Sequence, residues 1–320
     1  MSEATAVQAP RRMRVVAKDT IADGVVAVRL ADADGGEVAT WEPGAHIDLE
    51  LECGLVRQYS LCGDPSDVGS LTVAVLREAS GRGGSIYVHD KLEEGDVLQV
   101  GGPRNHFALV DAPSYLFVAG GIGITPLLPM LRNAERRGAT WRLLYGGRTR
   151  SGMAFADELV TAYPEGVDIR PQDEFGLLDI AGALDATEDG VAVYCCGPEP
   201  LLQAVEAAGR ERRLDVHVER FAPKAVAEDA VDGTFDVELR RTGATVAVGA
   251  SESIIDALER VGVSVDFSCR EGTCGTCEVA VLGGEPDHRD SVLTEEEQAA
   301  GDAMMICVSR CRGSRLVLDL

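Results

Sequence analysis

The sequence lacks an uninterrupted apolar stretch long enough to cross a membrane. Its most apolar segment, residues 115–131, is broken by glycines and prolines at positions Gly120, Gly121, Gly123, Pro126 and Pro129. A membrane-spanning helix needs about 20 apolar residues with few such breaks. Residues 1–10 also lack the basic segment and apolar core of a secretory signal. We therefore expect a cytoplasmic protein that does not enter a membrane.

Basic residues are scarce relative to acidic ones. The chain carries 30 Lys and Arg against 53 Asp and Glu, for a formal net charge of −23. Such a surface repels nucleic-acid phosphates at long range, which argues against DNA or RNA as a partner. The acidity fits either a protein partner with a basic patch or a general need for solubility, and the composition does not choose between them.

A disulfide framework is absent as well. The nine cysteines are an odd number, and most of them fall in one short region of the chain. Cysteines spread along a short secreted chain are typical of disulfide scaffolds, whereas a local cluster is more typical of a metal site in a reducing compartment. The cysteine usage therefore indicates a cytoplasmic protein with a metal centre.

The sequence does contain enough apolar material for more than one domain. It has 320 residues, of which 45% are hydrophobic, and a chain of this length usually forms two or three domains of roughly 100–150 residues. In the first part, short β-rich runs without a long amphipathic helix predict an antiparallel β-barrel. The expected strands cover residues 14–16, 25–30, 46–51, 71–76 and 97–100.

After residue 113 the pattern changes to alternating strands and helices, which predicts a parallel sheet with helices on its faces. The expected strands cover residues 115–119, 141–145, 192–195 and 216–219, and the helices 126–137, 154–161 and 199–212. Residues 223–232, rich in Ala and acidic residues, are interpreted as a linker. A small α+β unit follows, with a helix over 254–261 that Ser253 can cap. Its strands are expected at 235–240, 245–248, 277–282 and within 304–320.

The spacing of four cysteines is the most specific pattern in the sequence. Cys269, Cys274 and Cys277 follow C-x4-C-x2-C, and Cys307 comes later in an apolar segment. This is the ligand spacing of plant-type 2Fe–2S clusters, and the small residues between the cysteines let backbone amides approach the sulfurs. A zinc site is the alternative, but structural zinc usually takes two paired knuckles and only one C-x2-C is present. Three further cysteines have no place in this pattern and are interpreted as ordinary thiols: Cys53, Cys62 and Cys311.

A glycine-rich turn, GGIGITP at residues 120–126, follows the first strand of the predicted parallel sheet. Thr125 suits the N-cap and Pro126 the first position of the next helix. Glycines let a diphosphate approach the backbone, and the helix N-terminus adds N–H donors. The turn is not G-x-G-x-x-G, so a standard Rossmann motif is not predicted, and a plain βα connection is the alternative.

A second turn, CCGP at residues 195–198, follows another predicted strand. In a parallel sheet both turns open at the same edge, where ligands bind. Arg148 ends a third strand and either contacts an adenosine ribose or belongs to a simple solvated turn. In the barrel, the arginine of RQYSL (57–61) and the glycines of GRGGS (81–85) suit a phosphate. Each motif alone is also explained by a surface arginine or an ordinary turn.

Together the motifs resemble the ferredoxin–NADP reductase superfamily, specifically its phthalate dioxygenase reductase type. The resemblance covers about residues 10–320 and is carried by RQYSL, GRGGS, GGIGITP, CCGP, SCREGTCGTC (268–277) and DHRDSVLT (287–294). It implies a multi-domain fold: an FMN-binding antiparallel β-barrel over 10–111, an NAD(P)-binding α/β domain over 112–222, a linker over 223–232 and a β-grasp 2Fe–2S ferredoxin domain over 233–320.

The resemblance also implies site residues. Those expected against FMN are Arg57, Tyr59, Ser60, Gly83, Gly84, Ser85 and Phe221. Those expected against NADH are Gly120, Gly121, Gly123, Thr125, Pro126, Cys196, Gly197 and Pro198, with Thr125 and Cys196 shaping the nicotinamide pocket. The expected cluster ligands are Cys269, Cys274, Cys277 and Cys307.

The predicted function is an oxidoreductase that takes a hydride from NADH onto FMN and passes single electrons through the cluster to an oxygenase, either Rieske-type or haem-thiolate. Arg270, Glu271 and Thr273 are expected to contact that partner, and a monomer is expected. Arg148 and Arg150 leave room for the 2′-phosphate of NADPH. The alternatives are a stand-alone NADH:acceptor flavin reductase or oxidase and a redox-sensing regulatory module.

Overall fold

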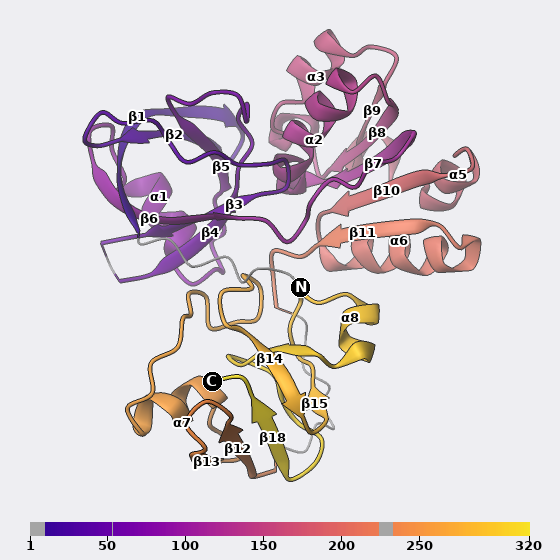
Figure 1. Cartoon of the computed structure of the whole chain (residues 1–320). Helices are drawn as coiled ribbons and strands as arrows, with labels where there is room; N and C mark the ends of the chain where they lie inside the picture. The colour runs from indigo at the N-terminus through magenta and orange to yellow at the C-terminus, as the bar shows by residue number, and fades with distance from the viewer. Residues whose placement is uncertain (1–9, 53, 224–232) are drawn as a thin grey trace. The chain divides into compact units, whose positions relative to one another are not determined.

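The computed structural model describes residues 10–52, 54–223 and 233–320 (Figure 1). The chain divides into two compact units, one that ends at Glu219 and one that spans Arg220–Leu320. Among the described residues, no helix is long and apolar enough to cross a bilayer. The expected linker lies outside them except for its first position, and so does Cys53.

The first half of the longer unit is an antiparallel barrel. Its six strands have the order β4-β3-β6-β1-β2-β5, and a bridge between Leu61 and Val73 joins the two ends of the sheet. Alternate positions such as Val26, Val28 and Leu30 are buried in the core, as the period of a strand requires. The elements are β1 (Arg11–Ala22), β2 (Val25–Asp32), β3 (His46–Glu50), β4 (Val56–Ser60), β5 (Leu71–Leu76), α1 (Gly84–Asp90) and β6 (Val97–Arg104).

The second half of this unit is a five-stranded parallel sheet in the order β11-β10-β7-β8-β9. The order reverses between β7 and β10, which places a ligand-binding crevice at their carboxyl ends. The strands are β7 (Ser114–Gly120), β8 (Thr140–Gly147), β9 (Val167–Pro171), β10 (Val191–Cys196) and β11 (Asp215–Glu219). The helices are η1 (Gly121–Gly123), α2 (Ile124–Arg136), η2 (Arg150–Gly152), α3 (Ala156–Ala162), α4 (Gln172–Phe175), α5 (Ile180–Asp185) and α6 (Glu199–Arg212).

Hydrogen bonds fasten the barrel to the parallel sheet within this unit. The Tyr194 hydroxyl, on β10, donates to the carbonyl of Ala108 at 2.8 Å and accepts from the backbone N–H of Val110 at 2.7 Å. Arg132, on α2, donates to the carbonyl of Gly63 in the barrel at 3.0 Å. The segment that connects the two halves is therefore fixed by hydrogen bonds to the buried ring of Tyr194.

The Arg220–Leu320 unit is an α+β fold around one apolar core. Its main sheet has the order β13-β12-β18-β14-β16 and combines a parallel β12–β18 pair with antiparallel neighbours. Ser253 caps α7 in a capping box with Asp256, as predicted. The elements are β12 (Phe235–Leu239), β13 (Thr245–Val248), α7 (Ile254–Arg260), β14 (Glu278–Gly283), β15 (Pro286–Asp287), α8 (Glu295–Ala300), β16 (Ala303–Met305), β17 (Arg310–Cys311) and β18 (Arg315–Leu318).

The predicted fold class is confirmed, and the differences are local. The elements β9, α4, α5 and α8 were not predicted because they are short, and α8 opens with three glutamates and buries no residue. The expected N-cap at Thr125 and the expected first helical position at Pro126 are both wrong, because α2 begins at Ile124 directly after η1 and Pro126 is its third residue. The Thr125 hydroxyl instead donates to the carbonyl of Ile122 at 2.9 Å.

Candidate functional site

Four cysteine thiols converge in the Arg220–Leu320 unit. Cys274, Cys277 and Cys307 are buried, and Cys269 is half-buried. Cys269 is within hydrogen-bonding reach of Cys274 and Cys307, and Cys277 is within reach of Cys307. The hydrogen bond with Cys274 lowers the pKa of Cys269, which favours a thiolate at that position.

Backbone amides of the cysteine loop point at these sulfurs. The N–H of Glu271 donates to Cys269 Sγ at 3.2 Å, and the N–H of Thr276 donates to Cys274 Sγ at 3.4 Å. Gly272 has a φ of 70°, a left-handed conformation that lets the loop turn back on itself. Within the described residues, no three His, Cys, Asp or Glu side chains form a preformed site for one metal ion. The donor set fits a two-iron centre, because hydrogen-bonding contacts link the four thiols in series and backbone amides surround them.

Arg270, one of the expected docking residues, is already engaged inside its own unit. Its guanidinium lies 2.8 Å from a carboxylate oxygen of Asp256 and 2.6 Å from one of Glu259. It also lies over the ring of Phe267, 4.1 Å from the centroid. Reversing its charge would therefore break intramolecular contacts as well as any contact with a partner. The docking role of Arg270, Glu271 and Thr273 stays a prediction.

In the barrel, Arg57 and the GRGGS turn lie against each other. Arg57 donates to the carbonyls of Val56 at 2.8 Å and Arg82 at 3.1 Å. A Cβ at Gly84 would lie within 2.5–3.0 Å of the Arg57 side chain, so only glycine allows this approach. Ser85 lies in the first turn of α1, where its hydroxyl accepts from the N–H of Glu78 at 3.1 Å. An arginine fork beside this glycine turn fits the phosphate of a flavin mononucleotide.

Tyr59 and Ser60 follow Arg57 on β4. Tyr59 packs against the barrel core, and burial is the main cause that raises its pKa to about 12, so its hydroxyl stays protonated. Ser60 is buried at the end of the strand. Phe221 belongs to the other unit and is 46% exposed. Its expected place beside a flavin stays a prediction.

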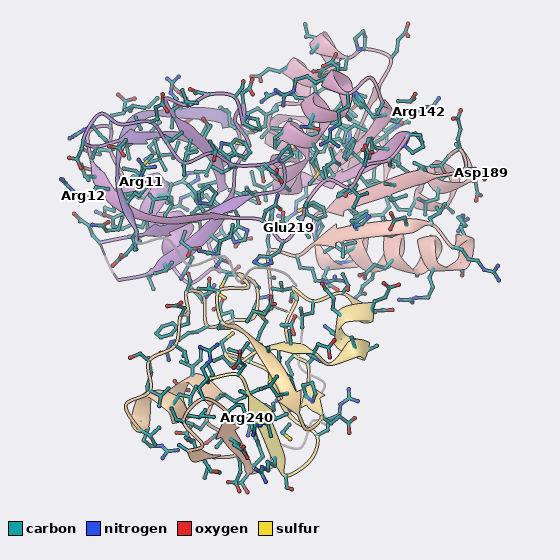
Figure 2. All side chains as sticks on the ribbon, in the orientation of Figure 1. Arg11, Arg12, Arg142, Asp189, Glu219 and Arg240 are labelled. Carbon is teal, nitrogen blue, oxygen red and sulfur yellow. The ribbon has the colours of Figure 1, made fainter. Side chains whose placement is uncertain are left out.

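The Ser60 hydroxyl meets two residues of the parallel sheet. It donates to Glu219 Oε2 at 3.3 Å, and the thiol of Cys196 donates to the same oxygen at 3.9 Å. Cys196 and Glu219 stand side by side because the register of β10 and β11 pairs them. Figure 2 labels Glu219 at the end of β11. This residue was not predicted, although an acidic residue that ends a strand next to CCGP was the available signal.

The Glu219 carboxyl group is perturbed. Glu219 as a whole residue is only partly buried, but its carboxyl group is enclosed, and burial raises its pKa to about 8. Burial likewise raises the pKa of the Cys196 thiol, with the Glu219 carboxylate adding to the effect. Both groups are therefore neutral at pH 7. Perturbed titratable groups that meet at a sheet edge mark a functional site.

The two predicted nucleotide turns face each other at the reversal point of the sheet. A Cβ at Gly197 would lie 2.9 Å from the Cα of Gly120, and one at Gly123 would lie 2.2 Å from the carbonyl oxygen of Cys196. The loops after β7 and β10 are thus in backbone contact. Thr125 is buried beside them, and Pro198 is the residue before α6. Gly121 has open space where its side chain would be. A diphosphate can approach this backbone closely.

Arg148 and Arg150, at the end of β8, differ in their surroundings. Arg150 forms an ion pair with Asp157 at 2.6 Å. Arg148 is exposed, and its carbonyl accepts from the N–H of Asp173, in the first turn of α4. The charge of Arg150 is thus paired within the protein, whereas Arg148 contacts α4 through its backbone carbonyl.

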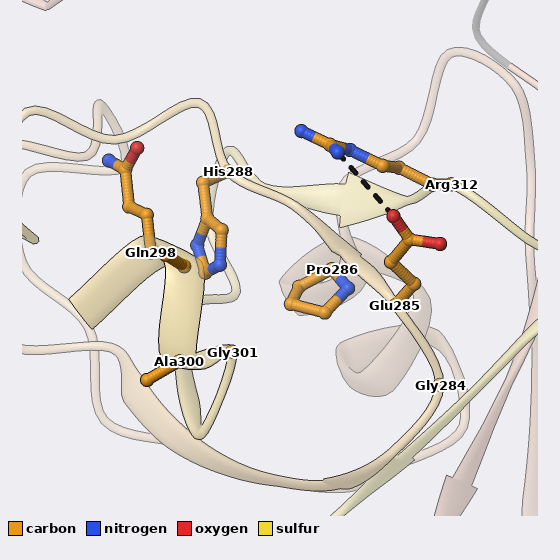
Figure 3. A pocket seen from close by; sticks show the side chains of 9 residues that line it. Gly284, Glu285, Pro286, His288, Gln298, Ala300, Gly301 and Arg312 are labelled. Atoms are coloured by element: carbon orange, nitrogen blue, oxygen red, sulfur yellow. Dashed lines mark hydrogen bonds and ion pairs between the residues drawn. The ribbon is translucent and has the colours of Figure 1, made fainter. Parts of the chain in front are cut away.

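A cavity of about 390 Å³ lies elsewhere, in the Arg220–Leu320 unit (Figure 3). Its lining includes His288, Gln298 and Arg312, the last of which pairs with Glu285 at 3.4 Å. None of the predicted site residues lines this cavity. We therefore locate the candidate site by the converging polar groups and glycine turns.

Comparisons with known proteins agree with this geometry. The sequence profile of the 2Fe-2S iron-sulfur cluster binding domain matches residues 237–312. The chain is 44% identical to phenoxybenzoate dioxygenase subunit beta of Ectopseudomonas oleovorans, over 99% of both chains. It superposes on solved phthalate dioxygenase reductase with a TM-score of 0.71 and 36% identity, covering 97% of this chain and 98% of the other.

A second solved structure, an intact type IV self-sufficient cytochrome P450 monooxygenase, matches with a TM-score of 0.91 and 43% identity. The match covers 97% of this chain but only 41% of that one. Barrel, nucleotide sheet and iron–sulfur unit in this order define a flavin- and iron–sulfur-dependent reductase. The chain belongs to the phthalate dioxygenase reductase family.

Proposed function

We propose that this chain is the reductase component of an oxygenase system, which takes a hydride from NADH and delivers electrons one at a time to an oxygenase. One observation carries the proposal: the Ser60 hydroxyl of the barrel and the Cys196 thiol of the nucleotide sheet both donate to Oε2 of Glu219. Hydride transfer needs a flavin and a nicotinamide to be held face to face, and a junction of these two folds provides such a place. The four cysteine thiols of the same chain would hold the iron–sulfur cluster that passes single electrons to the partner.

The proposed cofactors are FMN and one 2Fe–2S cluster. When bound, FMN converts the two electrons of a hydride into single electrons, and the cluster carries them one at a time. Arg57, with Gly83, Gly84 and Ser85, holds the phosphate, while Tyr59 covers the ring. The cluster ligands are Cys269, Cys274, Cys277 and Cys307.

The protein positions the nicotinamide and controls protons near it. Gly120, Gly121, Gly123, Gly197 and Pro198 form the diphosphate edge with Pro126 in the first turn of α2. Thr125 and Cys196 shape the nicotinamide pocket. Ser60 orients the Glu219 carboxyl group, which is protonated at pH 7 and so places no charge in the pocket. No residue has to act as a nucleophile.

The proposed partner is a terminal oxygenase, Rieske-type or haem-thiolate. A dioxygenase subunit among the relatives supports the first kind, and the fused P450 monooxygenase supports the second. The formal net charge of −23 favours a partner with a basic surface. NADH is preferred over NADPH in this proposal, since the charge of Arg150 is paired with Asp157. The protein is expected to be a cytoplasmic monomer.

The test uses the purified full chain, reconstituted without oxygen with FMN, iron and sulfide. We expect NADH to bleach the flavin absorption and to drive rapid reduction of cytochrome c. The Cys274→Ser variant should still reduce its flavin with NADH but should no longer reduce cytochrome c rapidly. Cys311→Ser is the matched control, because Cys311 lies on β17 outside the group of four thiols, and it should retain both.

Three results contradict the proposal. If Cys274→Ser reduced cytochrome c as fast as the unchanged protein, the chain would be a stand-alone flavin reductase. If the reconstituted protein stayed colourless, it would bind neither group. Slow cytochrome c reduction by all variants would indicate a redox sensor instead.

A further inference from the structure

A buried carboxylate packs against the cysteine loop of the Arg220–Leu320 unit. Asp290, between β15 and α8, is 1% exposed. A Cβ at Gly272, in the loop between Cys269 and Cys274, would lie 3.0 Å from Asp290 Cα and 3.2 Å from its Cβ. The next residue, Ser291, donates its N–H to the Gly272 carbonyl at 2.8 Å. Asp290 therefore touches the backbone that carries two of the four thiols.

The same side chain also reaches the segment of the fourth thiol. Its Oδ1 lies 3.5 Å from the hydroxyl of Ser309, two positions after Cys307. The Ser309 hydroxyl in turn accepts from the N–H of Arg289 at 3.2 Å. The carboxylate is thus held between the two chain segments that must surround the cluster.

No positive side chain in the described part of the protein pairs with Asp290. Its Oδ2 accepts from the backbone N–H groups of Val292 at 3.0 Å and Leu293 at 2.8 Å. Arg289, next to it in the chain, pairs with Asp287 instead. The basic group nearby is His288, whose Nδ1 lies 3.8 Å from Asp290 Oδ1.

His288 does not supply a compensating charge at neutral pH. Its ring is largely enclosed, with a side-chain exposure of 5%. Burial is the main cause that lowers the pKa of His288, Arg312 lowers it further, and Asp290 and Asp287 act in the opposite direction. Figure 3 shows the ring beside Gln298, Pro286 and the end of α8. A neutral His288 ring adds no positive charge beside the buried Asp290 carboxyl group.

We propose that Asp290 lowers the reduction potential of the cluster held by the four cysteines and so makes the reduced centre a stronger electron donor. One-electron reduction adds a negative charge to the centre, and a buried carboxylate nearby opposes that addition strongly where the local dielectric is low. Net charge is one of the means by which a protein sets such a potential. This inference rests on the proposed function, because it requires the cluster.

A purely structural role is the competing explanation, since Asp290 also caps the turn before α8. Two neutral substitutions separate the two roles in the full chain. Asp290→Asn and Asp290→Ser both keep a side-chain oxygen that can accept the N–H groups of Val292 and Leu293, but neither keeps the charge. Asp287→Asn is the matched control, because it removes the same charge from a 30% exposed side chain that is already paired with Arg289.

The measurement is an anaerobic redox titration of the reconstituted protein, followed by the electron paramagnetic resonance signal of the reduced cluster. At a fixed potential, both Asp290 variants should raise the ratio of reduced to oxidised cluster by about 3- to 10-fold, where tenfold corresponds to ~59 mV for one electron. Asp287→Asn should change this ratio less than twofold.

Three outcomes overturn the inference. The first is an unchanged midpoint in either Asp290 variant, and the second is an equal shift in Asp287→Asn. The third is loss of the cluster in both neutral Asp290 variants, which would assign the residue a structural role only. An unchanged protein that assembled no cluster would instead overturn the proposed function itself.

Discussion

The Ser60 hydroxyl donates to the Glu219 carboxyl group across 3.3 Å, although 159 positions separate the two residues in the chain. Ser60 ends β4 of the barrel and Glu219 ends β11 of the parallel sheet. The bond therefore joins the edge proposed for the flavin to the edge proposed for the nicotinamide. Changes at this pair should affect the reaction between them.

Glu219→Gln should remove a pH dependence from flavin reduction. The buried carboxyl group has a pKa of about 8, so in the unchanged protein it becomes negative above that pH. A negative charge there stabilises the positive charge that develops on the nicotinamide as hydride leaves. We expect the rate to rise roughly 10-fold between pH 7 and 9.5 in the unchanged protein and to stay flat in the Gln variant.

Anaerobic stopped-flow mixing with NADH measures this rate. Glu211→Gln is the control, because the Glu211 side chain is 79% exposed on α6, and it should keep the rise. The same rise in Glu219→Gln would assign the titration to another group.

The same substitution should alter how the free energy of unfolding changes between pH 5 and 8. Glu219 has its pKa raised from 4.5 to about 8 in the folded state, so between these values the folded protein binds a proton that the unfolded chain has released. Stability contributed by this position is therefore lost as pH rises through that window, by about 1–3 kcal/mol. Glu219→Gln should lose less stability than the unchanged protein between pH 5 and 8. Urea unfolding midpoints of both proteins at pH 5 and pH 8 test this. An equal change in midpoint between the two pH values in both proteins would contradict it.

Gly123→Ala should disturb the nucleotide edge by steric contact alone. The backbone of Gly123 has an ordinary φ of −63°, but its new Cβ would lie 2.2 Å from the Cys196 carbonyl oxygen. The loop must move, and overpacking of this kind costs about 1–3 kcal/mol. We expect KM for NADH to rise about 10-fold. Gly152→Ala, whose nearest contact is 3.4 Å away, should leave KM unchanged, and equal KM values in both variants would refute the steric argument.

Arg57→Ala should weaken FMN binding. A charge-assisted hydrogen bond to phosphate contributes about 1.5–3 kcal/mol, which corresponds to roughly 10- to 100-fold in Kd. Arg57→Lys should recover only part of this, because an ammonium lacks the planar fork. Fluorescence titration of flavin-free protein with FMN gives the Kd, with exposed Arg29→Ala on β2 as control. An unchanged Kd in Arg57→Ala would place the phosphate elsewhere.

Local patterns were sufficient for most elements, and the assignment of the four cysteines as cluster ligands stays a prediction. Helix α6 was predicted with its bounds, and the Ser253 cap of α7 was confirmed, because helical periodicity and capping depend on residues a few positions apart. The predicted N-cap at Thr125 was wrong because it depends on packing beyond the local sequence. The η1 turn before α2 depends on how the glycines pack against β10, which the local pattern does not contain.

The sequence by itself determined the order of the folds, the four cysteines and the two glycine turns, since each is encoded by spacing within a short stretch of chain. Three contacts could be known only from the tertiary structure. Glu219 accepts a hydrogen bond from Ser60, and Asp290 packs against Gly272. Arg270 forms ion pairs with Asp256 and Glu259. Acidic residues are common, and in this chain they outnumber basic ones. The role of an individual acidic residue therefore depends on folding. Folding buries the residue beside a particular neighbour, where desolvation makes its charge unfavourable and the neighbour determines its protonation state.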